Sequence, residues 1–359
     1  MTDEDFMVRA FQLAERGRGR TSPNPLVGSV VVSPQGVVLG QGYHERAGEA
    51  HAEIHALDAA GVAARGATLY CTLEPCAHVG RTGPCAHRIV TAGIARVVAA
   101  MRDPNPLVSG KGFEYLRAHG VSVEVGVGEE QAIRLNRPYL TFISRKRPFV
   151  ILKAAISRDG YVATGAGVRS QLTSDESLRH AHRVRAEVDA IGVGSTTVLV
   201  DDPELTVRGV HRERPLTRVI FDRRLRTPSN ARVLSTLSQG PVIILASAEV
   251  MSHSTHRVNE LTSVGATVHG LESTDVASAL QQLGSLQIVS LVLEGGPTLQ
   301  AAAWEAGVID CVHLYVAPVT VGSTGVEWLP TEILSTLVET REQKLGVDTF
   351  TEGYVHRTD

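Results

Sequence analysis

Three side chains in the first third of the chain have the types and spacing of ligands for a catalytic metal ion. His51 opens a His-Ala-Glu sequence, and Cys76 follows a proline. Cys85 comes nine residues after Cys76. One imidazole and two thiolates provide three ligands for zinc and leave a fourth position open, which is typical of zinc that activates a water molecule. Glu53, two residues past His51, could move protons without binding the metal.

This order of residues is typical of zinc-dependent nucleobase deaminases, although their second cysteine usually comes three residues after the first. Glycines and prolines between Cys76 and Cys85 could fold the chain back so that Cys85 begins the next helix, where the helix dipole favours a thiolate. The alternatives are a closed structural site, with His55, His78 or His87 as fourth ligand, and simple buried cysteines. A structural site has no need of a glutamate beside the metal.

Two proline-rich segments of the first half are candidates for contacts with a substrate. Asn24 lies between Pro23 and Pro25 on the loop before the first predicted strand, where its amide could contact the edge of a base. Asp103-Pro104-Asn105-Pro106 follows another predicted strand, at a position where α/β proteins bind ligands. The alternative for each segment is an ordinary turn, which the sequence around Asn24 taken alone favours.

The second half contains a lysine and a glycine turn that indicate cofactor chemistry. Lys153 lies within an apolar strand, and a buried lysine costs free energy unless it is paired, so it could bind a phosphate or polarise a group that receives hydride. Glu294-Gly295-Gly296-Pro297 follows a further apolar strand and would allow close approach of a phosphate to a helix N-terminus. Arg223 could contact the 2′-phosphate of NADP. A plain turn and a solvated charge pair are equally compatible with these two segments.

The elements that must position these residues alternate between strand-like and helix-like patterns. In the first half we expect helices near 6–14 (with Thr2 as a possible N-cap), 50–64, 85–92 and 113–118, and strands at 26–32, 37–43, 67–72, 95–100 and 121–125. The pattern breaks between 136 and 148, and a second alternation follows, with strands at 149–156, 190–193, 218–222, 242–246, 267–270, 288–294 and 311–317. This predicts two α/β domains, 1–146 and 147–359, the first with a sheet covered by helices on both faces.

Composition excludes several other classes of protein. The chain has 359 residues, 43% of them hydrophobic, and a net charge of −3, which is ordinary for a globular protein and argues against binding of nucleic acid or of an anionic membrane. It has no apolar run of the roughly 20 residues needed to span a bilayer. The acidic start lacks the apolar region of a signal peptide, so the predicted location is the cytoplasm.

Several of these segments together match one known family. In the first half they are Pro23–Pro25, Gly42–His44, His51–Glu53, Thr72–Cys76, Pro84–Cys85 and Asp103–Pro106; in the second they are Lys153–Ser157, Thr197–Leu199, Asp201–Pro203, Leu205–Arg208 and Gly296–Leu299 with Glu294. The chain resembles the bifunctional deaminase–reductases of riboflavin biosynthesis. The wide cysteine spacing is the one that this family uses.

The resemblance implies a fold and an activity for each domain. The first would have the three-layer α/β/α fold of cytidine deaminases and remove an amino group from a diaminopyrimidinone ribosylamine phosphate. The second would resemble dihydrofolate reductase and use NADPH to reduce the ribosyl chain of the deaminated product to ribityl. His51, Cys76 and Cys85 would bind Zn²⁺ and Glu53 would move protons, while Asn24 and His44 would contact the substrate. The family also implies a homo-oligomer.

For the second domain, the resemblance implies a substrate site and a cofactor site. The substrate residues would be Lys153, Arg169, Arg185, Leu205, Arg208 and Glu294. The cofactor residues would be Ala155, Gln171, Thr197, Asp201, Arg223, Gly296, Pro297, Thr298, Leu299, Gln300, Ala301 and Ala302. The family usually has a serine at the position of Arg169 and a tryptophan at that of Gln171.

Those two departures leave open a deaminase with a weak or binding-only second domain. The metal motif by itself would also permit a nucleic-acid deaminase or a zinc-stabilised binding protein. The near-neutral charge of the chain speaks against the nucleic-acid deaminase.

Overall fold

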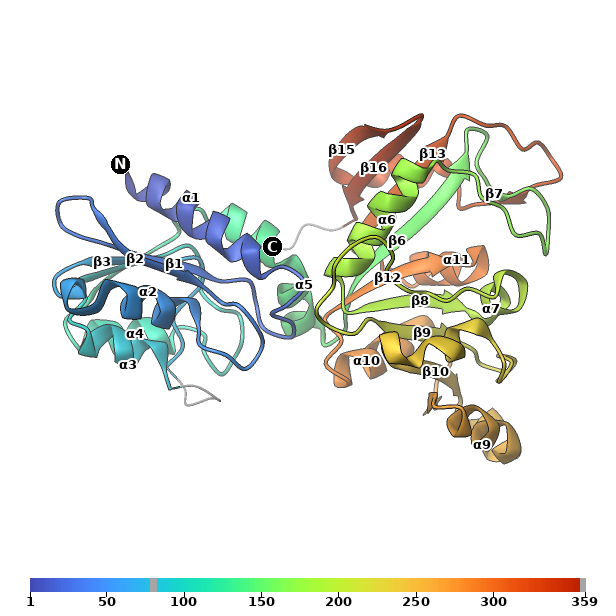
Figure 1. The fold of residues 1–359 in the computed structure, drawn as a ribbon, viewed down its shortest axis with the longest axis horizontal. Coiled ribbons are helices and arrows are strands. Elements are labelled where there is room, and N and C mark those ends of the chain that lie inside the picture. Colours follow the sequence, from blue (N-terminus) through green and yellow to red (C-terminus); the bar gives the residue numbers. More distant parts are fainter. Residues whose placement is uncertain (78–82, 356–359) are drawn as a thin grey trace. The chain divides into compact units, whose positions relative to one another are not determined.

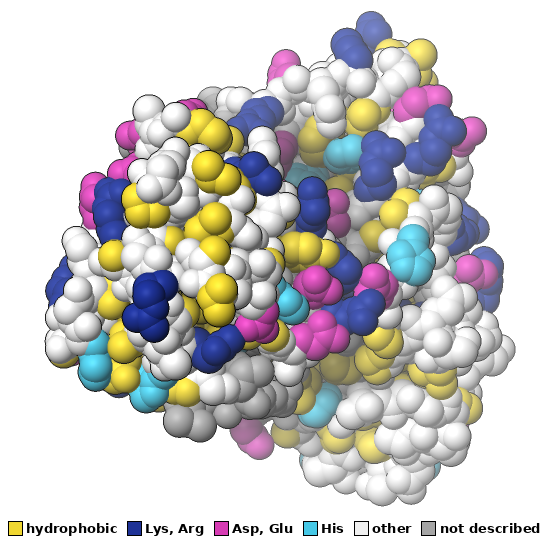
Figure 2. Space-filling view, turned by 60° about the vertical axis from the view of Figure 1, so that its left-hand side comes forward, with side chains coloured by type: hydrophobic (Ala, Val, Ile, Leu, Met, Phe, Trp, Pro, Cys, Tyr) yellow, Lys and Arg dark blue, Asp and Glu magenta, His cyan; other side chains and the backbone are white. Residues whose placement is uncertain are grey.

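The computed structural model describes residues 1–77 and 83–355, and the chain divides after Arg145 into two compact units (Figure 1). Both units are α/β, as predicted. On the face of the molecule that Figure 2 shows, Lys and Arg side chains are interspersed with Asp and Glu side chains. Among the described residues, no helix has the length and apolar character needed to span a membrane.

The first unit is built on a five-stranded sheet of order β2-β1-β3-β4-β5. Strand β1 pairs antiparallel with β2 and β3, and β3, β4 and β5 run parallel. The strands are β1 (Gly28–Val32), β2 (Val38–Tyr43), β3 (Thr68–Cys71), β4 (Arg96–Ala99) and β5 (Ser122–Val125). The helices are α1 (Asp3–Ala14), α2 (Ala52–Ala60), α3 (Cys85–Thr91), α4 (Lys111–Ala118) and α5 (Glu129–Arg145).

Helices cover both faces of this sheet and make three layers (Figure 1). Helix α1 packs so closely on β1 that a Cβ at Gly28 would lie 2.0 Å from the carbonyl oxygen of Ala10. On the opposite face, a Cβ at Gly42 of β2 would lie 2.3 Å from the Cβ of His55 in α2. The two glycines therefore let α1 and α2 lie directly on opposite faces of the sheet, and α2 is the helix that follows the metal ligand His51.

We expected the alternation of strands and helices to break between 136 and 148. This expectation is wrong for the residues up to Arg145, because helix α5 includes them and continues past Pro138. The helix bends at Asn136, whose φ and ψ are −109° and 17°. The buried Asn136 amide accepts from the backbone N–H of Leu26 at 2.8 Å and donates to its carbonyl at 3.0 Å. A proline just after a bend acts like a proline in the first turn of a helix, where its missing N–H costs little.

The second unit has a nine-stranded sheet of order β11-β10-β9-β8-β12-β6-β13-β16-β15. The strands from β11 to β13 are parallel, and β16 and β15 continue the sheet antiparallel. They are β6 (Phe149–Ser157), β8 (Ala190–Gly194), β9 (Thr217–Phe221), β10 (Val242–Ser247), β11 (Thr267–Leu271), β12 (Ser290–Gly295), β13 (Cys311–Ala317), β15 (Val338–Leu345) and β16 (Asp348–Tyr354). A separate pair joins β7 (Tyr161–Ala163) and β14 (Val326–Glu327).

Two apolar cores lie on the two faces of this sheet. One includes Leu152 and Ile156 of β6, and the other includes Ile191 and Val193 of β8. The helices are α6 (Asp175–Glu187), α7 (Ser195–Asp201), α8 (Ala248–His253), α9 (Thr255–Ser263), α10 (Val276–Ser285) and α11 (Pro297–Glu305). Strands β8 and β12 are neighbours and parallel, so their carboxyl ends lie side by side, where α/β proteins bind ligands.

Candidate active sites

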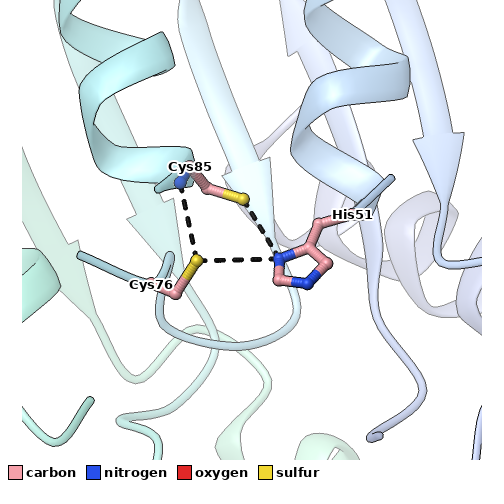
Figure 3. Close-up of side chains that lie close together, drawn as sticks. All are labelled: His51, Cys76 and Cys85. Atoms are coloured by element: carbon pink, nitrogen blue, oxygen red, sulfur yellow. Dashed lines mark hydrogen bonds between the residues drawn. The ribbon is translucent and has the colours of Figure 1, made fainter. Parts of the chain in front are cut away.

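The three predicted metal ligands come together in the first unit (Figure 3). His51 immediately precedes α2, Cys85 begins α3, and Cys76 lies in the loop after β3. The Nδ1 atom of His51 is 3.2 Å from the Sγ of Cys85 and 3.6 Å from the Sγ of Cys76. Nitrogen and sulfur ligands of a tetrahedral zinc ion lie about 3.5 Å apart, so the donor set and its spacing fit Zn²⁺.

Local contacts favour a thiolate at this site. The backbone N–H of Cys85 points to the Sγ of Cys76 at 3.5 Å. Hydrogen bonding from Cys85 lowers the pKa of Cys76 to about 4, against the effect of burial. As expected, Cys85 begins a helix. The thiolate favoured by these contacts is that of Cys76, however, because the hydrogen bond with Cys76 and burial raise the pKa of the Cys85 thiol.

The histidines of the closed-site alternative lie elsewhere or outside the described residues. The ring of His87 stacks on Tyr115 with centroids 4.2 Å apart. His55 is one turn along α2 and is absent from the group of donors within 4.8 Å of one another, which among the described residues holds only His51, Cys76 and Cys85 in this unit. His78 lies outside the described residues.

Glu53 lies in the first turn of α2 and is only 3% exposed. Burial raises the pKa of its carboxyl. Its position two residues after the ligand His51 places a proton carrier beside the metal donors, which act on its pKa, while the carboxylate is absent from the donor group itself.

Asn24 and His44 form a hydrogen-bonded pair next to the donor group. The Asn24 amide nitrogen is 3.1 Å from Nε2 of His44, and Nδ1 of His44 is 3.1 Å from the carbonyl oxygen of Ala50. Burial lowers the pKa of His44, so the neutral ring donates from Nδ1 and accepts at Nε2. The His44 and His51 rings meet edge to face at 5.4 Å.

The sequence analysis missed Glu74, which organises the loop after β4. Its buried carboxylate accepts hydrogen bonds from the backbone N–H groups of Asp103 (3.3 Å), Gly110 (2.9 Å) and Gly112 (3.0 Å). A Cβ at Gly112 would lie 1.9 Å from the carbonyl oxygen of Pro75. Glu74 thereby holds this loop against the segment that carries Cys76. Its only sequence signal was a charge directly before the Pro-Cys pair.

The second unit contains a pocket of ≈ 230 Å³ at the carboxyl ends of β8 and β12. Seven predicted residues line it: Arg169, Arg185, Thr197, Asp201, Leu205, Arg208 and Glu294. Lining residues that the sequence analysis missed are Ser170, Val193, Pro203, Glu204, Thr206 and Arg232. Arg169 thus lies in the pocket, where its positive charge opposes the rise that burial causes in the pKa of Asp201.

A largely buried ion pair lines this pocket. Arg185 donates from Nε and Nη2 to the two carboxylate oxygens of Glu294, each at 2.6 Å. The charges of Arg185 and Glu294 also act on Lys153, whose Nζ lies 5.7 Å from the ring centre of Tyr315. Burial lowers the pKa of Lys153, partly offset by Glu294.

The remaining predicted cofactor residues lie outside the lining of this pocket. Ala155 packs beside Tyr315, Arg223 and Gln171 are exposed, and the Gly296–Ala302 segment forms the start of α11. A Cβ at Gly296 would lie 3.4 Å from the Oγ1 of Thr197, so this turn adjoins the pocket. Gln300 is directed into the core, where its amide donates to the Lys153 carbonyl at 2.9 Å and accepts from the Trp328 indole at 3.0 Å.

A second group of possible metal donors, Cys311, His313 and Glu352, lies on β13 and β16. His313 and Glu352 are cross-strand partners with Nε2 and Oε1 3.8 Å apart. Glu352 also accepts a hydrogen bond from the Tyr354 hydroxyl at 2.9 Å.

Comparison with known proteins identifies both units. Residues 1–101 match the model of the cytidine and deoxycytidylate deaminase zinc-binding region, and residues 148–356 match that of the RibD C-terminal domain. The chain therefore joins a zinc-binding deaminase domain to a reductase domain.

Several relatives are similar over most of the chain. The riboflavin biosynthesis protein RibD of Aquifex aeolicus is 44% identical over 320 residues, which are 89% of this chain and 88% of the relative. The Escherichia coli protein of the same name is 40% identical over 329 residues, 90% of this chain and 89% of the relative. The solved structure of Acinetobacter baumannii RibD, form 1, has a TM-score of 0.87 and 35% identity, covering 99% of each chain.

A Thermotoga maritima structure is also similar, with a TM-score of 0.83, 33% identity and 98% coverage of each chain; it is named a diaminohydroxyphosphoribosylaminopyrimidine deaminase and 5-amino-6-(5-phosphoribosylamino)uracil reductase. The chain belongs to the RibD family. It is a bifunctional enzyme of riboflavin biosynthesis, a deaminase and a reductase with zinc and NADPH as cofactors. The predicted family, fold class and cofactors are thereby confirmed.

Proposed function

We propose that residues 1–146 form a deaminase domain that acts on 2,5-diamino-6-(5-phosphoribosylamino)pyrimidin-4(3H)-one. Water replaces the amino group, ammonia leaves, and the product is 5-amino-6-(5-phosphoribosylamino)uracil. The observation that carries this proposal is the triangle of His51, Cys76 and Cys85 beside the buried Glu53. The similar Thermotoga maritima protein is named for the same deamination.

Each residue of this site has a role that follows from its place. His51, Cys76 and Cys85 would hold zinc, which supplies a Lewis acid that activates water near neutral pH. Glu53 would take a proton from the attacking water and deliver it to the departing amine. Asn24 and His44 would orient the pyrimidine ring, because their hydrogen bond fixes both side chains beside the metal donors.

We propose further that residues 147–359 form the reductase domain, which reduces the ribosyl chain of the deaminated product to ribityl. NADPH supplies the hydride when bound. The substrate residues would be Lys153, Arg169, Arg185, Leu205, Arg208 and Glu294, because four of the pocket-lining residues are arginines suited to a phosphate ester. Lys153 would polarise the group that receives the hydride.

The cofactor would bind along the neighbouring turn and strands. Its contacts would be Ala155, Gln171, Thr197, Asp201, Arg223, Gly296, Pro297, Thr298, Leu299, Gln300, Ala301 and Ala302. Contact between the Gly296 turn and Thr197 supports this placement. Gln300 would act through its backbone, because its side chain is held in the core.

Product mass spectrometry tests both steps in one experiment. Supplied with the diamino substrate, the zinc-loaded protein should form the deaminated product without NADPH and the ribityl product only with NADPH. Glu53→Gln should stop deamination while reduction of the deaminated substrate persists, and the exposed Glu49→Gln should change neither. Deamination without any reduction would support a binding-only second domain. Absence of both products would refute the substrate assignment.

The assembly and location of the enzyme are part of the same proposal. We propose a homo-oligomer, in line with the family resemblance, and light scattering of the purified chain measures this directly. We place the enzyme in the cytoplasm, which is supported by four buried cysteines that form no disulfide. Fractionation of the source cells tests the location.

A further inference from the structure

The wall of the reductase pocket from residue 205 to residue 208 belongs to a segment without helix or strand. This segment runs from the end of α7 to the start of β9 and contributes Leu205, Thr206 and Arg208 to the pocket. An irregular segment has no ladder of backbone hydrogen bonds, so its position depends on the side chains that hold it.

Helix α6 holds this segment at two points close to the pocket. His182 accepts a hydrogen bond at Nδ1 from the backbone N–H of Arg208 at 3.2 Å. One turn later, Arg185 donates from Nη1 to the carbonyl oxygen of Thr206 at 2.9 Å. Both contacts end on the backbone of the wall, so they fix where the Arg208 side chain begins.

Arg212 makes a third connection, in which the side chain belongs to the segment and the backbone acceptors belong to α6. From the same segment, it donates through Nη1 to the carbonyl oxygens of Arg185 (3.0 Å) and Ala186 (2.6 Å) in the last turn of α6. It also donates through Nη2 to the carbonyl oxygen of Pro215 at 3.3 Å. The last carbonyls of a helix have no partner within the helix, so Arg212 both satisfies them and closes the segment onto α6.

The protonation state of His182 suits its contact. The residue is 9% exposed, and burial, with the charges of Arg185 and Arg208, lowers its pKa to about 4. The ring is therefore neutral near pH 7, with its proton on Nε2 and a free lone pair at Nδ1. A cationic ring could not accept the Arg208 N–H.

We propose that His182 and Arg212 are positioning residues of the reductase, which hold the pocket wall so that Arg208 and Thr206 face the pyrimidine ribosyl phosphate. Neither residue lines the pocket, so both act through the backbone that they bind. The inference rests on the proposed reductase function. Loss of these contacts should weaken binding of the phosphorylated substrate more than binding of NADPH.

The test compares three variants of the full chain. His182→Phe keeps a ring and removes the acceptor, His182→Asn keeps an acceptor near the position of Nδ1, and Arg183→Gln changes an exposed neighbour on the same helix. For His182→Phe we expect an about tenfold rise in KM for the pyrimidine substrate, the equivalent of one lost interaction. The KM for NADPH and the deaminase rate should stay within about twofold. His182→Asn should restore most of the loss, and Arg183→Gln should resemble the wild type.

Two results would overturn the inference. One is an unchanged KM for the pyrimidine in His182→Phe, and the other is an equal rise in both KM values, which indicates general damage to the domain. If His182→Phe does not fold, the half-buried Arg212→Met takes its place, with the same selective effect expected. The wild type is assayed first: a wild type that never reduces the substrate refutes the proposed function, whereas an active wild type with insensitive variants refutes only the positioning role.

Discussion

Replacing Glu294 with glutamine measures how much one carboxylate stabilises the second unit. This carboxylate accepts two 2.6 Å hydrogen bonds from Arg185. Burial alone would raise its pKa, but the charges of Arg185 and Lys153 outweigh burial and lower the pKa from 4.5 to about 2. Since one pKa unit equals about 1.4 kcal/mol, the ionised group contributes about 3 kcal/mol at neutral pH. That value lies at the low end of the about 3–5 kcal/mol lost when a buried ion pair is broken.

Calorimetry of the full chain should show the loss as a lower Tm. About 3 kcal/mol corresponds to a decrease of roughly 10 °C for a unit of this size, and hydrogen exchange should assign the change to β12 and its neighbours. The contribution depends on pH. The pKa of Glu294 is lower in the folded state than in the unfolded state. The difference in free energy of unfolding between wild type and Glu294→Gln is therefore fully present above about pH 4.5 and disappears as the pH falls toward 2.

The matched control is Glu204→Gln at the same pocket. Glu204 pairs with Arg232, but the two side chains are 27% and 49% exposed, and such pairs contribute at most about 1 kcal/mol. If Glu294→Gln and Glu204→Gln lost the same free energy of unfolding, the reasoning would be refuted, because burial would then not decide the strength of an ion pair. A Glu294→Gln loss that stays constant down to pH 2 would also refute it.

Three further predictions concern the first unit. Removing zinc with a chelator should abolish deamination and leave the rate of reduction unchanged when the deaminated pyrimidine is supplied directly with NADPH, and equal loss of both activities would contradict separate sites. Cys76→Ser should lower the zinc content below one ion per chain by mass spectrometry, whereas Cys71→Ser, in β3, should retain it. Asn136→Leu should lower the free energy of unfolding by about 1–3 kcal/mol in urea titration, because the backbone N–H and carbonyl of Leu26 lose their partners; an unchanged midpoint would contradict this.

The parts of the fold that the sequence predicted are those in which a local pattern and burial agree. Strands β1 and β6 consist mostly of buried apolar residues, and both lie where the sequence predicted a strand. The sequence analysis missed β15 because its residues are charged or polar and mostly exposed, so they show no apolar period. The expected break between 136 and 148 begins inside α5, at the bend before Pro138. The Asn136 side chain is held there by the backbone of the distant Leu26, which the sequence does not reveal.

The metal donors were predictable for a different reason. Zinc requires particular donor atoms, so the residue types alone restrict the candidates, and two of the three donors begin or immediately precede a helix. Glu74 had no such restriction. Its role depends on three backbone N–H groups of residues 103–112, and backbone groups have no signature in the side-chain sequence.

In the reductase domain, the residues that the family resemblance named are not always the ones whose contacts shape the pocket. Gln300 lies in the segment predicted to line the cofactor, yet its amide joins β6 to Trp328 inside the core. His182 attracted no prediction, yet it binds the backbone of the pocket wall. In both cases the decisive partner is a main-chain atom far away in sequence, and such a partner becomes visible only when the sheet brings the segments together. Residues that hold other residues in place are therefore the part of this active site that the sequence is least able to reveal.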